Sequence, residues 1–92
     1  MNKNQEIALK SKLLGLAKSG QYVESKKLAL YLNEQLPTDL EVWFALAQIQ
    51  QALGEYDSAL KSFERVAARK SDNRARALAS IVSLCIELKL LD

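Results

Sequence analysis

Two matching segments, Gly20-Gln21-Tyr22 and Gly54-Glu55-Tyr56, stand 34 residues apart in the chain. Each one follows a stretch in which apolar residues recur every three or four positions, the spacing of an amphipathic helix. A period of 34 residues over paired helices indicates a repeat protein in which each helix pair is one unit. We therefore expect residues 6–39 and 40–73 to be two units and 74–91 to be the first helix of a third, all within a single domain of 92 residues.

The ends of these helices are marked by residues that stop or start a helix. Gly20 and Gly54 suit the left-handed conformation that follows a helix C-terminus, and the ring of Pro37 blocks the helix that approaches it. Thr38 or Asp39 offers the next N-cap. The fold class predicted is all-α, an antiparallel helix-pair solenoid of about two and a half repeats and five helices.

Residues 40–73 resemble a tetratricopeptide repeat. The matching positions are Trp43, Leu46, Ala47, Gly54, Tyr56, Ala59 and Phe63. Gln50 departs from the tyrosine of the pattern and Ser71 from its closing proline. Residues 6–39 resemble a degenerate copy that keeps the closing proline at Pro37.

Nothing in the composition predicts an enzyme. The chain has no histidine, which removes the commonest general base and metal ligand, and its carboxylate pairs stand beside helix starts, where acids stabilise the helix dipole. Cys85 is the only cysteine and lies between Leu84 and Ile86, so we expect a buried structural thiol. We predict no catalytic residue, no metal and no cofactor.

Nucleic acid and membranes are also not expected as partners. The net charge is only +2, and no aromatic residues interleave with the densest basic run to stack bases. That run comprises Arg65, Arg69, Lys70, Arg74 and Arg76. The uncharged stretch 77–86 is too short to span a bilayer, which requires about 20 apolar residues. The polar start predicts no export signal, so we expect a cytoplasmic protein without stable membrane insertion.

The tetratricopeptide resemblance implies a concave groove lined by the first helix of each pair. Its candidate residues, carried over by position, are Ile7, Lys10, Leu14, Ala17, Phe44, Gln48, Gln51, Ala75, Leu78 and Val82. Relatives that bind acidic chaperone tails use asparagines where this chain has Leu14 and Gln48, so such a clamp is not expected. A largely apolar groove suits the apolar face of an amphipathic partner helix.

The last helix is unusually apolar for the end of a solenoid. Twelve of the eighteen residues 74–91 are apolar, although the terminal helix of a solenoid normally has a polar face exposed to water. Either the helix is buried on two sides within its own chain, or it meets another chain, which we favour. Candidates for a second interface are Leu9, Leu13, Ile81, Cys85 and Leu88.

Four segments, 19–21, 29–32, 40–46 and 71–74, resemble the small tetratricopeptide-type chaperones of the type III secretion needle subunit. The resemblance implies a chaperone in the bacterial cytoplasm that binds the amphipathic helix of the needle subunit and prevents premature polymerisation. It also implies a small helical co-chaperone, for which Ile7, Leu9 and Leu13 are the candidate contacts. The alternative is a generic peptide-binding or self-associating adaptor with another client.

Overall fold

A computed structural model describes residues 1–91, which form five α-helices and no strand. The helices are α1 (Lys3–Lys18), α2 (Tyr22–Gln35), α3 (Leu40–Ala52), α4 (Tyr56–Ala67) and α5 (Arg74–Leu91). The prediction of an all-α fold with five helices is confirmed. Helix α2 ends before Pro37, because proline disfavours helical backbone at the preceding residue, and Leu36 has a φ of −130°.

The two glycine turns have the same geometry. Gly20 and Gly54 both have a φ of +79°, in the left-handed region that only glycine enters without strain. In each turn the N–H of the next residue donates to the carbonyl oxygen five positions earlier, which closes the helix with a Schellman motif. These bonds run from Gln21 to Leu16 (3.0 Å) and from Glu55 to Gln50 (2.8 Å). The 34-residue period is therefore a repeat of backbone conformation as well as of sequence.

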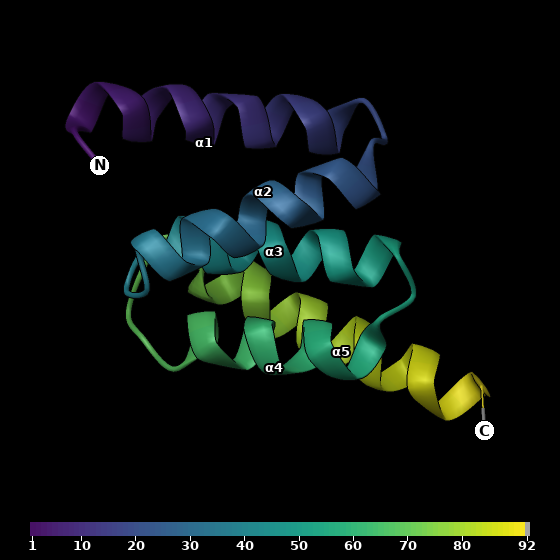
Figure 1. Ribbon diagram of the computed structural model, residues 1–92. Coiled ribbons are helices and arrows are strands. Elements are labelled where there is room, and N and C mark those ends of the chain that lie inside the picture. The colour runs from purple at the N-terminus through teal and green to yellow at the C-terminus, as the bar shows by residue number, and fades with distance from the viewer. Residues whose placement is uncertain (92) are drawn as a thin grey trace.

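Consecutive helices run antiparallel and pack into two layers (Figure 1). Helix α3 contacts α2 and α4, α5 contacts α4, and α1 contacts both α2 and α3. Helices α1, α3 and α5 thus belong to one layer and α2 and α4 to the other. The stack begins with α1 at the top of Figure 1 and ends with α5, so the N-terminus and the C-terminal helix lie at opposite ends.

The core consists of two clusters that share helix α3. The N-terminal cluster joins α1, α2 and α3 and contains Leu13, Ala29, Leu32, Val42, Ala45, Leu46 and Ile49. The C-terminal cluster joins α3, α4 and α5 and contains Phe44, Ala47, Ala59, Phe63, Val66, Ala77 and Leu84. Trp43 packs against both clusters. One face of α3 therefore packs against α1 and α2 and another against α4 and α5, as expected for a helix inside a solenoid.

One buried polar contact crosses the C-terminal half of the stack. The Ser62 hydroxyl donates to Oε1 of Gln50 at 2.8 Å, and both side chains are buried. This bond satisfies two polar groups that would otherwise be costly to bury. Gln50, which departs from the tyrosine of the repeat pattern, thus links α3 to α4 through a hydrogen bond.

Helix α5 is covered on one side only within the described residues. Ala77 and Leu84 are buried against α4, whereas Leu78, Val82 and Ile86 are 46%, 60% and 56% exposed. The possibility that this chain buries α5 on two sides is therefore wrong. The buried thiol expected at Cys85 is also wrong, because Cys85 lies on the exposed side of the helix.

Candidate binding groove

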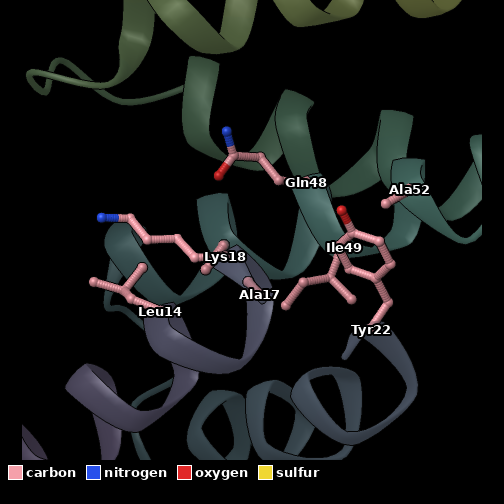
Figure 2. Close-up of a pocket in the computed structure, with 8 residues that line it drawn as sticks. Leu14, Ala17, Lys18, Tyr22, Gln48, Ile49 and Ala52 are labelled. Carbon is pink, nitrogen blue, oxygen red and sulfur yellow. The ribbon is translucent and has the colours of Figure 1, made fainter. Parts of the chain in front are cut away.

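A pocket of about 290 Å³ lies between α1 and α3 on the layer formed by the odd-numbered helices. Its lining residues are Leu14, Ala17, Lys18, Tyr22, Ala45, Gln48, Ile49 and Ala52. Figure 2 shows the α1 side chains opposite Gln48 and Ala52 of α3, with Tyr22 from the start of α2 near Ile49. The walls are apolar apart from the Lys18 ammonium, the Gln48 amide and the Tyr22 hydroxyl, so the pocket suits an apolar side chain.

The structure brings three of the sequence-derived groove candidates together in this pocket: Leu14, Ala17 and Gln48. Leu14 is 56% exposed, which leaves its side chain available to a partner. Ile7 is exposed about two turns before it on α1. Leu78 and Val82 are exposed on α5, beyond the pocket, where they would extend an apolar surface across the layer.

Sequence reasoning missed Lys18, Tyr22, Ala45, Ile49 and Ala52 as pocket residues. The 34-residue period contained a signal for two of them. Lys18 and Ala52 occupy equivalent positions in the two units, just as Leu14 and Gln48 do. Because equivalent positions of stacked units lie side by side, carrying the period one residue further would have added this pair.

The expectation that Phe44 faces a partner is wrong. Phe44 is only 6% exposed, and its ring packs edge-on against that of Phe63, with centroids 5.7 Å apart. The Arg76 guanidinium lies 4.9 Å from the Phe44 ring centroid on another side. Helix α5 therefore covers the position that the repeat pattern assigns to the groove, and Phe44 contributes to the core.

Gln51 is turned towards α5. Its Nε2 donates to Oε1 of Glu87 at 3.5 Å, and the side chain is half-buried. This contact ties the last turn of α3 to the C-terminal half of α5. Gln51 therefore lies at the junction of these helices, beside the groove.

Lys10 is engaged in a cluster of acids. Its ammonium forms an ion pair with Asp39 and lies 3.6 Å from a carboxylate oxygen of Glu6 and 3.6 Å from one of Glu41. Asp39 also caps α3, since its Oδ1 accepts from the N–H groups of Glu41 and Val42 at 3.0 and 3.3 Å. Lys10 therefore fixes α1 against the start of α3, which gives this groove candidate a structural role.

The acids also shift the pKa of Lys10. Partial burial of the ammonium acts to lower the pKa, but the hydrogen bond and charge of Asp39, with the charges of Glu41 and Glu6, outweigh burial and raise the pKa above 10.5. A raised pKa in the folded state means that the charged lysine stabilises the fold below pH 10.5 and loses this effect as the pH rises through the folded pKa.

We therefore expect Lys10→Met to lower the melting temperature at pH 9 and the difference from the wild type to shrink above pH 10.5. Thermal melts followed by circular dichroism between pH 9 and 11.5 measure this difference in melting temperature. The matched control is Lys12→Met, because Lys12 is exposed and has no ion pair with residues 1–91. A Lys10→Met difference that stays constant over this pH range would contradict the assignment.

The candidates for a second interface are divided between core and surface. Leu13 is only 2% exposed and belongs to the N-terminal cluster, so the expectation that it meets another chain is wrong. Leu9 and Ile81 are half-buried and pack against the N-terminal and C-terminal clusters respectively. Leu88 is half-buried and Cys85 exposed. Of the two helices that hold these candidates, α5 also carries a row of exposed apolar side chains, Leu78, Val82 and Ile86.

Within residues 1–91, no group of His, Cys, Asp and Glu side chains is arranged to hold a metal ion. No helix of the same range has both the length and the apolar character needed to cross a membrane.

Stacked antiparallel helix pairs with an apolar pocket between first helices define a helical-repeat protein of the kind that binds other polypeptides. A family model described as "Tetratricopeptide repeat" matches residues 16–81. The chain therefore belongs to the tetratricopeptide repeat family, whose members are typically adaptors without enzymatic activity. The comparison with curated proteins finds no match to the chain.

Proposed function

We propose that the chain is a protein-binding module whose groove takes the apolar face of an amphipathic helix. The observation that carries the proposal is the apolar pocket between α1 and α3, with Leu14 exposed on its wall. Leu78 and Val82, on α5 of the same layer, are further exposed apolar side chains. A helix presents apolar side chains at intervals of three and four residues, which suits a surface made of parallel helical ridges.

Hydrophobic burial supplies the driving force of this binding. Burial of about 500 Å² of apolar surface on a partner helix contributes on the order of 12 kcal/mol before the costs of association and ordering. The groove would then compete with any other surface that the same apolar face could join. Such competition is the physical basis of both an adaptor and a holding chaperone.

The test is binding of a fluorescein-labelled amphipathic peptide with leucine at helical spacing and glutamine elsewhere, measured by fluorescence anisotropy. Leu14→Glu is expected to weaken binding at least tenfold, because it places a charge in the apolar pocket. The matched control is Val23→Glu on α2, since Val23 is 60% exposed and lies outside that pocket. It should change the Kd less than twofold.

Circular dichroism checks that both variants keep the helicity of the wild type. If Leu14→Glu and Val23→Glu weaken peptide binding equally, the groove is not the binding surface. A wild-type chain that binds no such peptide would refute the proposed function.

The finer proposal is a type III secretion chaperone of the needle subunit, working with a small helical co-chaperone in the bacterial cytoplasm. Its support is the resemblance of segments 19–21, 29–32, 40–46 and 71–74 together with the apolar groove. The native mass of the chain, co-expressed with the short helical proteins encoded beside its gene, tests it. A defined complex with a needle-type protein encoded beside the gene would support the chaperone function. A monomer that binds none of these proteins would contradict it and favour the generic adaptor.

A further inference from the structure

Helix α1 is held to the rest of the molecule by few buried side chains. Leu13 is the one buried residue among its sixteen, whereas α3 buries seven of thirteen. Helix α1 lies at the top of Figure 1, at one end of the stack, and it packs mainly against α2 and only lightly against α3. The pairing of α1 with α2 is therefore more firmly fixed than the distance between α1 and α3.

The seam between α1 and α3 is incompletely packed. The groove pocket of about 290 Å³ takes up the part of the seam near the C-terminal end of α1. A second pocket of about 30 Å³ lies nearer the middle of α1 and is lined by Lys10, Leu13, Leu14, Glu41, Val42 and Ala45. Well-packed protein interiors leave few voids larger than a water molecule. Because Leu14 borders both pockets, it adds few of the van der Waals contacts that would hold α1 to α3.

The strongest tie across this seam is electrostatic. Within residues 1–91, every salt bridge from α1 to another part of the chain is made by Lys10, and its partners are Asp39 and Glu41 at the start of α3. The side chains of Lys10 and Asp39 are only 23% and 19% exposed, so solvent screens their attraction less than it would on an open surface. Asp39 is itself fixed, because its carboxylate caps α3.

We propose that the ion pair of Lys10 with Asp39 is a latch that sets the width of the groove, and that α1 moves away from α3 when the latch is broken. Helix α1 keeps its contact with α2 in this motion. In the latched state Leu14 and Ala17 line the pocket opposite Gln48 (Figure 2). In the open state the two walls separate, so a partner helix reaches only one of them at a time.

The latch therefore decides what fraction of the molecules is ready to bind. The apparent Kd of a partner rises as the fraction of molecules in the binding state falls. This consequence for binding rests on the proposed function, whereas the motion of α1 is a property of the free chain. The two are tested separately below.

Energy transfer from Trp43 to a dansyl label on α1 reports the width of the seam in solution. Trp43 is the one tryptophan of the chain and belongs to α3. The label is attached at the exposed Ser11, changed to cysteine, in a Cys85→Ser background that removes the one native cysteine. We expect Lys10→Met and Asp39→Asn each to lower the transfer efficiency, because each removes one charge of the latch.

The choice of variants separates the latch from damage to the fold. Asparagine is as good an N-cap as aspartate, so Asp39→Asn preserves the start of α3. Lys10→Arg keeps the charge and should keep most of the transfer. Lys12→Met should leave the transfer unchanged, because Lys12 is exposed on the same helix and forms no ion pair with residues 1–91.

A second label position shows whether the loss is confined to α1. Ser58→Cys places the dansyl group on the exposed side of α4, and transfer to it from Trp43 should be the same with and without Lys10→Met. Circular dichroism verifies that every variant keeps its helicity. Unchanged transfer to position 11 in both Lys10→Met and Asp39→Asn would overturn the latch. Equal losses at positions 11 and 58 would also overturn it, because they would show that the whole stack loosens.

The binding arm uses the amphipathic leucine peptide with glutamine elsewhere. Lys10→Met should raise its Kd about threefold, the value expected if about one third of the molecules remain latched. Saturation of Lys10→Met with unlabelled peptide should restore the transfer to position 11, because a bound helix holds both walls together. Binding without this recovery would contradict the latched state as the binding state. A wild-type chain that binds no such peptide would refute the proposed function, and the energy transfer of the free chain would still decide the latch.

Discussion

Replacement of Phe63 by alanine is expected to lower the free energy of unfolding by about 3–5 kcal/mol. Phe63 is fully buried on α4, and its ring meets the Phe44 ring edge-to-face at 5.7 Å. The substitution removes the largest fully buried side chain of the molecule and leaves a cavity at the centre of the C-terminal cluster. Domains of this size have a total stability of about 5–15 kcal/mol, so the variant should be close to unfolding at 37 °C.

Urea denaturation followed by circular dichroism and by Trp43 fluorescence measures the effect. Trp43 packs against both clusters, so its signal reports on the whole stack. Lys61→Ala on the exposed side of the same helix is the control and should stay within about 0.5 kcal/mol of the wild type. A loss below about 1 kcal/mol for Phe63→Ala would mean that α4 does not pack through this ring.

Leu32→Ala is expected to cost about 2–5 kcal/mol, because Leu32 is fully buried on α2 in the N-terminal cluster. The two substitutions should differ in where the molecule opens. In a solenoid each helix pair contacts only its neighbours, so a loss of packing in one core cluster destabilises the helices of that cluster first. Leu32→Ala should therefore destabilise α1 and α2 more than α4 and α5.

Hydrogen exchange of the backbone amides distinguishes the two variants. Exchange should accelerate most in α1 and α2 for Leu32→Ala and most in α4 and α5 for Phe63→Ala, relative to the wild type under the same conditions. Uniform acceleration along the whole chain in both variants would show that the two clusters unfold as one cooperative unit. The division of the core between two helix pairs would then have no energetic consequence.

Much of the fold could be predicted because its signals are local. The glycines at 20 and 54, the cap at Asp39 and the apolar spacing each act within one helix or one turn, and all lie where the structure has the corresponding helix ends. The period of 34 then placed equivalent turns and equivalent groove positions side by side. Leu14 and Gln48 meet in one pocket for this reason.

The burial of individual side chains could not be predicted in the same way. Phe44 belongs to the repeat's groove positions, yet Arg76 and Phe63 cover it, and Lys10 is occupied by three acids from α1 and the α3 start. Cys85 shows the opposite error, since its apolar neighbours in sequence do not cover it in space.

The sequence by itself determined the helices, their ends, the repeat and the apolar excess of α5, because backbone conformation and helical periodicity depend on neighbouring residues. Only the tertiary structure decided which face of each helix is covered, because that depends on how helices distant in the chain cross.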